Sequence, residues 1–158
     1  MPKHTIAFAA VDPKGLIGKR AGPSGWRSVA QEQIDTFAQL SGDRQWIHVD
    51  VERARAESPY GRTIAHGNLT LAMVDGFRDE LTTGLDGVEV GVNYGYERVR
   101  FPAAVPAGSR VRATSETLAV EARSDGWWKV VQRFVVELED SEKPACVADS
   151  VVLVRLAG

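Results

Sequence analysis

The stretch that decides the fold is Asn68-Leu69-Thr70-Leu71-Ala72-Met73-Val74-Asp75-Gly76-Phe77-Arg78-Asp79-Glu80-Leu81. Its apolar residues cover almost every face of the first two helical turns, which predicts a helix that is buried on all sides. In a chain of 158 residues, a curled sheet that wraps around such a helix would bury it. The segments on either side of this helix should therefore include that sheet.

Strand signals follow the helix. From Val88 to Tyr96 apolar and polar residues alternate with a period of two, and the phase then slips before Val99, as it does at a β-bulge. Further strands are predicted over 111–122, which should also contain a bulge, and over 128–138 and 146–156, with a hairpin turn at Asp125-Gly126. Long antiparallel strands around a buried helix describe a hot-dog fold of the α+β class.

Two shorter helices are predicted before the buried one. The run Ser28-Val29-Ala30-Gln31 fits a capping box that starts a helix, and Gly42 suits the left-handed position that ends it. Asp50 is a candidate N-cap for a second helix that reaches Ala56. The signals change from helix to strand once, near Gly84, without a linker or a repeat, so we expect one domain over residues 1–158.

The composition excludes several classes of protein. Hydrophobic residues make up 44% of the chain and charged residues 25%, which is ordinary for a folded soluble protein. A net charge of −2 gives no basic surplus for nucleic acid, and no apolar run approaches the roughly 20 residues of a membrane span. The apolar run 6–10 is too short for a signal peptide, so we expect a cytoplasmic protein.

The one cysteine excludes an internal disulfide framework and any site that several cysteines would form. Cys146 lies in the apolar run Ala145-Cys146-Val147-Ala148, which predicts a buried strand residue without a catalytic role.

The densest group of polar side chains lies in the predicted loop between the two shorter helices. It places Asp43 and His48 five positions apart, where both could contact one small molecule, most simply water. A structural alternative stays open from the spacing alone. In that alternative Asp43 caps the short helix or pairs with Arg44, and His48 is a satisfied histidine of the core.

A second polar group opens the buried helix, in Ile64-Ala65-His66-Gly67-Asn68. A helix start presents free N–H groups and a partial positive charge, and a glycine there lets a ligand approach the backbone closely. The Gly67 N–H could thus hold an oxygen that gains negative charge. Alternatively, Gly67 serves only close packing between helix and sheet. His66 is predicted to be structural and to orient the turn.

Together the two groups resemble a known family. A glycine and an aspartate, a polar step of two residues, an aliphatic residue and a histidine are followed about eighteen residues later by Ala-His-Gly. This order resembles the MaoC-type hydratases, the R-specific enoyl-CoA hydratases of the hot-dog superfamily, including the NodN-like branch. The resemblance extends from Trp26 to Leu156, and it includes the loop segments 99–102 and 105–108.

The resemblance implies roles for individual residues. Asp43 and His48 fall on the catalytic pair of the family, and Gly67 falls on the glycine whose N–H receives the thioester oxygen. Gln45 lies where most members carry asparagine, and Trp46 lies where they carry proline. Ser41, Gln45 and Asn68 are expected to orient the pair, whereas the segment 19–25 has no role that the resemblance assigns.

The implied activity is the hydration of a trans-2-enoyl-CoA to an (R)-3-hydroxyacyl-CoA, and the reverse dehydration, without a cofactor. No metal is expected, because His4, His48 and His66 show no ligand spacing. Two alternatives stay open, a hot-dog thioesterase and a non-catalytic module that binds acyl thioesters.

The expected partners are an acyl-CoA or acyl-carrier-protein substrate and a second copy of the chain. A homodimer is predicted because long strand edges invite pairing and because similar hot-dog proteins dimerise. Arg98 and Arg100 are candidate contacts for the CoA phosphates, with ordinary solvated strand residues as the alternative.

Overall fold

The computed structural model describes residues 13–81 and 87–157. Its elements are the 3-10 helix η1 (Pro13–Leu16), strands β1 (Arg20–Ala21) and β2 (Arg27–Ser28), helices α1 (Gln31–Ser41), α2 (Trp46–Val49), α3 (Val51–Glu57) and α4 (Gly67–Leu81), and strands β3 (Val88–Arg100), β4 (Arg110–Ala122), β5 (Trp128–Leu138) and β6 (Cys146–Leu156). The predicted change near Gly84 and the apolar run 6–10 lie outside the described residues.

The strands form one antiparallel sheet in the order β1-β4-β5-β6-β3, and β2 also pairs with β4. The predicted strands β5 and β6 have the observed bounds, and the Asp125-Gly126 hairpin joins β4 to β5. The register of β3 shifts between Tyr96 and Arg98, and that of β4 shifts between Thr117 and Ala119. These shifts confirm the predicted bulges, which bend the strands and help the sheet to curl.

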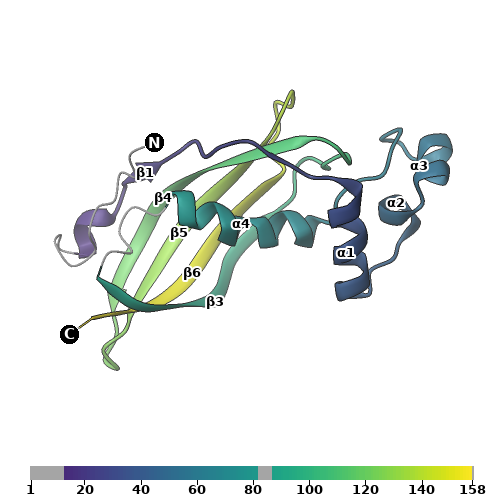
Figure 1. The fold of residues 1–158 in the computed structure, drawn as a ribbon. Coiled ribbons are helices and arrows are strands. Elements are labelled where there is room, and N and C mark those ends of the chain that lie inside the picture. The colour runs from purple at the N-terminus through teal and green to yellow at the C-terminus, as the bar shows by residue number, and fades with distance from the viewer. Residues whose placement is uncertain (1–12, 82–86, 158) are drawn as a thin grey trace.

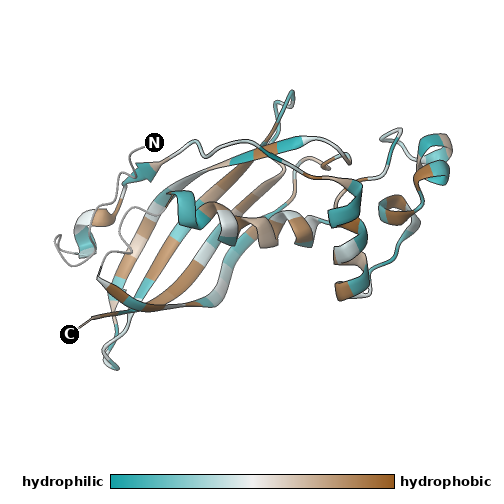
Figure 2. Cartoon of the chain, viewed as in Figure 1, coloured by the Kyte–Doolittle hydropathy of each residue, from teal (hydrophilic) through white to brown (hydrophobic). Residues whose placement is uncertain are grey.

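Helix α4 crosses the face of the curled sheet (Figure 1). Hydrophobic residues recur along β4, β5 and β6 behind it (Figure 2). Val74, Phe77 and Leu81 of α4 belong to one core cluster with residues of these three strands, among them Val111, Ala113, Phe134, Val136, Cys146 and Ala148. The arrangement is the α+β one that the sequence predicts.

Burial of α4 on all sides is not observed. Thr70, Val74, Phe77 and Leu81 form one buried stripe, whereas Ala72 is exposed. The reason is that the sheet of a single chain covers only one side of the helix.

The start of α1 also differs from the prediction. The helix begins at Gln31, and the side chain of Gln33 accepts a hydrogen bond from the Ala30 N–H at 2.8 Å. Ser28 pairs with Arg110 in the sheet instead of capping the helix. The other predicted ends are confirmed, because Gly42 is left-handed at φ 79° and the Asp50 carboxylate accepts from the Arg53 N–H at the start of α3.

Cys146 is fully buried in β6, as predicted. Burial raises the pKa of its thiol to about 11, which disfavours the reactive thiolate. In the described residues, no helix combines the length and the apolar composition needed to cross a membrane.

Candidate active site

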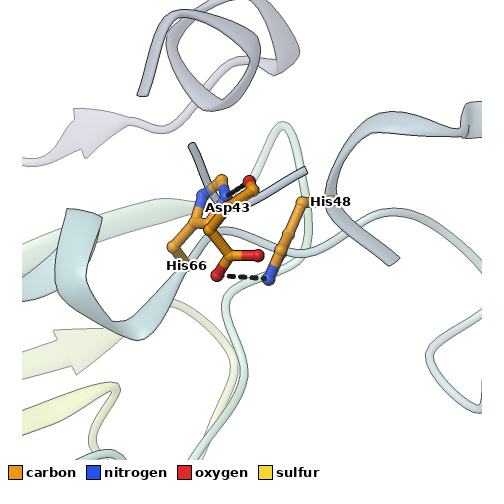
Figure 3. A group of neighbouring side chains, drawn as sticks. All are labelled: Asp43, His48 and His66. Atoms are coloured by element: carbon orange, nitrogen blue, oxygen red, sulfur yellow. Dashed lines mark hydrogen bonds and ion pairs between the residues drawn. The ribbon is translucent and has the colours of Figure 1, made fainter. Parts of the chain in front are cut away.

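The candidate site lies where α1, α2 and α3 gather, near the N-terminal end of α4 (Figure 1). It brings together the two polar groups of the sequence, since Asp43 and His48 come from the α1–α2 region and His66 directly precedes α4 (Figure 3). The sequence predicts a loop over 40–50, but residues 46–49 form the short helix α2, which carries His48.

The segment that carries Asp43 is shaped by local hydrogen bonds. The Ser41 hydroxyl donates to the Phe37 carbonyl at 2.7 Å and accepts from the Asp43 N–H at 3.2 Å. The Oδ1 atom of Asp43 accepts from the Gln45 N–H at 3.3 Å. Ser41 therefore contacts the backbone N–H of Asp43, whereas Gln45 contacts the Asp43 carboxylate through its own backbone N–H. The Asp43 side chain is 55% exposed.

His48 is buried, and one of its two ring nitrogens is committed to the backbone. Its Nδ1 lies 2.7 Å from the Ile64 carbonyl oxygen. Because a carbonyl only accepts, this contact requires a proton on Nδ1 and leaves the lone pair of a neutral ring on Nε2. That Nε2 lies 4.0 Å from Asp43 Oδ2 (Figure 3). Burial is the largest cause that lowers the pKa of His48 from 6.5, and the neighbouring His66 lowers it further.

His66 is buried between these groups. Its Nε2 lies 2.9 Å from the backbone carbonyl oxygen of Asp43, and its ring stacks on that of His48 with centroids 3.8 Å apart and planes 26° apart. Phe37 of α1 contacts the same ring at a centroid distance of 5.0 Å. The sequence predicts that His66 orients the turn before α4. It does not indicate the hydrogen bond to Asp43, which lies 23 positions earlier in the chain.

Gly67 is the first residue of α4. A Cβ atom at this position would lie 2.9 to 3.1 Å from three ring atoms of Phe101, so the close approach that requires glycine is made by this ring. The packing alternative for Gly67 thus has a physical basis, and it does not remove the free N–H at the helix start. Asn68 is exposed on the first turn.

The chain departs from the family pattern at positions 45 and 46, and the structure explains the departure at Trp46. The Arg53 guanidinium of α3 lies over the Trp46 ring, 4.3 Å from its centroid. This cation–π contact packs α2 against α3, which a proline at position 46 would not do.

The sequence predicts that Gln31 completes a capping box, but its side chain makes other hydrogen bonds. The amide Nε2 of Gln31 donates to the His48 carbonyl at 2.8 Å, and its oxygen accepts from the Thr63 hydroxyl. Gln31 therefore ties α1 to the backbone of His48 and to the segment before His66. No sequence spacing indicates this contact, because its partners lie 17 and 32 positions away.

The three side chains Asp43, His48 and His66 are close enough together to raise the question of a metal, since one ligand atom from each lies within 4.8 Å of the others. The ring arrangement does not fit one. Imidazole binds a metal through a lone pair in the ring plane, at about 2.0–2.1 Å. Two rings stacked 3.8 Å apart direct their lone pairs along nearly parallel planes, so these do not converge on one ion.

Arg98 and Arg100 lie on β3, and both are exposed. They line a hollow of about 460 Å³ together with Phe101, Pro102, Arg133 and Val147. Phe101 also lies against Gly67, so one side chain contacts both the hollow and the start of α4.

Known proteins resemble this chain along most of its length. Residues 13–136 match the family model described as MaoC like domain. The chain is 46% identical over 144 residues to the 3-hydroxyacyl-thioester dehydratase Z of Mycobacterium tuberculosis. This alignment covers 91% of the present chain and 94% of the relative. It is 36% identical over 152 residues to nodulation protein N of Rhizobium leguminosarum, which covers 96% and 93%.

A solved structure supports the predicted fold. The monoamine oxidase regulatory protein from Archaeoglobus fulgius aligns with a TM-score of 0.77 and 25% identity, over 98% of this chain and 97% of that one. The family model covers well over half of the chain, and the dehydratase and nodulation relatives align along nearly all of it. The chain therefore belongs to the MaoC-like family.

Proposed function

We propose that the protein adds water across the double bond of a trans-2-enoyl thioester to give an (R)-3-hydroxyacyl thioester, and catalyses the reverse dehydration. The observation that carries this proposal is the His48 Nε2 lone pair, fixed by the Ile64 carbonyl and held 4.0 Å from the Asp43 carboxylate. The 46% identical relative, a 3-hydroxyacyl-thioester dehydratase, supports the same reaction class.

The pair activates water. A separation of 4.0 Å is too long for a direct hydrogen bond and lets both groups contact one water molecule. Bulk water, with a pKa near 15.7, is a poor nucleophile. His48 takes a proton from this water, since its lowered pKa keeps it neutral at physiological pH. The Asp43 carboxylate orients the water and stabilises the imidazolium that forms.

The start of α4 stabilises the charge that the addition creates. When the oxygen of water attacks the β carbon, the electron pair of the double bond moves onto the thioester oxygen as an enolate. The Gly67 N–H would donate to that oxygen, a kind of contact worth roughly 3–4 kcal/mol. His48 then returns its proton to the α carbon on the same face, which completes a syn addition and restores the neutral ring.

Turnover of crotonyl-CoA tests the proposal. We expect the absorbance of the conjugated enoyl thioester to fall without release of free thiol, and chiral analysis to give the (R)-3-hydroxy product. Release of CoA would instead show a thioesterase. Binding without either change would show a non-catalytic module.

The basic hollow beside Phe101 is the proposed contact for the phosphate groups of the carrier, whether CoA or an acyl-carrier protein. Arg98 and Arg100 contribute exposed guanidinium groups there, and the ring of Phe101 connects the hollow to Gly67. The Arg133 side chain is already paired with Asp149 through two hydrogen bonds, at 2.7 and 2.8 Å.

The double variant Arg98→Gln/Arg100→Gln should raise KM for crotonyl-CoA about tenfold and leave kcat nearly unchanged, since losing two phosphate contacts removes uniform binding. KM for crotonyl-pantetheine, which lacks the phosphates, should stay the same. Arg155→Gln on β6 is the matched control, because this exposed arginine pairs with Glu89 instead of lining the hollow. Equal losses with both substrates would remove the phosphate assignment.

The position of β3 at the edge of the sheet, among the described strands, supports a homodimer. This strand ends the sheet order, and Val92 and Tyr94 on it are 47% and 63% exposed. An exposed edge with large apolar side chains is suited to pairing with a second copy. Sedimentation equilibrium at micromolar concentration should give twice the mass of the chain, and Val92→Lys should shift the population toward monomer. A wild-type monomer would contradict this assembly.

A further inference from the structure

We infer that His66 is a positioning residue, which holds the Asp43–His48 pair at a fixed place relative to the Gly67 N–H. This inference rests on the proposed function, because the water that the pair activates and the enolate oxygen that the N–H receives belong to one substrate. The two halves of the site come from different segments, so some contact must set the distance between them.

The local hydrogen bonds of Asp43 do not set that distance. Its N–H donates to Ser41 and its Oδ1 accepts from the Gln45 N–H, and both partners lie within two residues along the chain. These bonds fix the shape of the segment but not its place relative to α4. The bond from His66 Nε2 to the Asp43 carbonyl, at 2.9 Å, reaches from the start of α4 to this segment.

His66 also touches the second member of the pair. Its ring stacks on His48 at a centroid distance of 3.8 Å, and this contact fixes the plane in which the His48 Nε2 lone pair points. The backbone of His66 is joined to α4, because its carbonyl accepts the first hydrogen bond of the helix from the Thr70 N–H at 3.1 Å. One residue thus contacts the backbone of Asp43, the ring of His48 and the helix start.

The ring nitrogens of His66 show that hydrogen bonding, and not ring packing alone, explains a histidine here. Donation to a carbonyl requires the proton on Nε2, so in a neutral ring Nδ1 carries a bare lone pair. Nδ1 is buried and has no hydrogen-bond partner among the described residues. A phenylalanine would give the same stacking without this unsatisfied atom, which is costly to bury. The cost is offset only if the Nε2–H does something that phenylalanine cannot.

Two substitutions separate the hydrogen bond from the ring. His66→Phe keeps a stacking ring and loses the donor, and His66→Gln places an amide N–H near the position of Nε2 and loses the ring. We expect His66→Phe to lower kcat for hydration by about 10- to 100-fold, since small misplacements of reacting groups have effects of this size. KM should change by less than about twofold. His66→Gln should recover most of the lost kcat.

Thr70→Val is the matched control. The Thr70 hydroxyl donates to the backbone carbonyl of His66, at 3.4 Å, without contacting the His66 ring. We expect its kcat to equal that of the wild type. Wild-type kcat in His66→Phe, or a rise in KM at constant kcat, would overturn the positioning role. Equal loss in the Phe and Gln variants would also overturn it.

Nitrogen-15 NMR of the wild-type imidazoles provides a test that needs neither a variant nor turnover. It should show a proton on Nε2 of His66, and His48 neutral with its proton on Nδ1. A proton on Nδ1 of His66 would overturn the inference even if His66→Phe failed to fold. If the wild type hydrated no enoyl thioester, the proposed function would fail while the NMR result still decided the placement of His66.

Discussion

Replacement of Asp43 by asparagine should lower kcat for enoyl-thioester hydration by about 10²- to 10⁴-fold, the size of effect expected when a carboxylate that supports a catalytic histidine loses its charge. The substitution keeps the shape of the side chain and removes its charge. An asparagine oxygen can still accept the Gln45 N–H, so the turn over 43–45 should persist. What is lost is the carboxylate that orients water and stabilises the His48 imidazolium.

The measurement pairs steady-state kinetics with thermal unfolding. Because the Asp43 side chain is more than half exposed, stability should change by only about 0.5 kcal/mol. Asp50→Asn is the matched control, since it makes the same chemical change seven residues away, at the N-cap of α3, where asparagine caps equally well. A folded Asp43→Asn protein with near wild-type kcat would return Asp43 to a structural role.

Much of this fold can be predicted from the sequence where the signal is local. The alternation of apolar residues predicts the strand β3, the phase slip predicts a register shift before Val99, and Asp125-Gly126 predicts a turn, and all three features are observed. The burial expected along β3 is not, because Val92 and Tyr94 of its apolar face are exposed. Gly42 and Asp50 are predicted equally well, because a left-handed cap and a carboxylate N-cap act on their own turn.

Features that depend on distant partners could not be predicted in the same way. Ser28 has the right chemistry for an N-cap, but β4 recruits it into the sheet through a partner 82 positions away, Arg110. The exposed side of α4 depends on how far the sheet curls, which no residue pattern states.

In the candidate site, too, local features can be predicted from the sequence and contacts with distant partners cannot. Asp43 and His48 could be singled out from their spacing and from the family resemblance, and the structure places them 4.0 Å apart. The tautomer of His48 depends on the carbonyl of Ile64, and the contact between Asp43 and His66 crosses 23 positions. The chemistry of the pair was visible in the sequence, whereas the contacts that orient it are tertiary.

Replacement of His48 is the second substitution that we expect to lower kcat strongly. His48→Asn places an amide N–H near the position of Nδ1, so donation to the Ile64 carbonyl can persist while the titratable Nε2 is lost. We expect kcat to fall by about 10²- to 10⁴-fold. The double variant with Asp43→Asn should be little worse than the poorer single variant, because two groups that act on one water are not additive.

The pH dependence gives this assignment a signature that a structural role would not produce. Burial lowers the pKa of His48 below 6.5, so wild-type kcat/KM should stay constant as pH falls to that value and decline only below it, when the base becomes protonated. Stability should follow the same direction. Between pH 6.5 and the lowered pKa the unfolded chain binds a proton at this histidine more readily than the folded protein does, so the folded state loses stability as pH falls across this interval and loses no more below it. In His48→Asn this contribution to both profiles should be absent. An unchanged acid limb of kcat/KM in the folded variant would assign the base to another group, because no titration of His48 could then account for it.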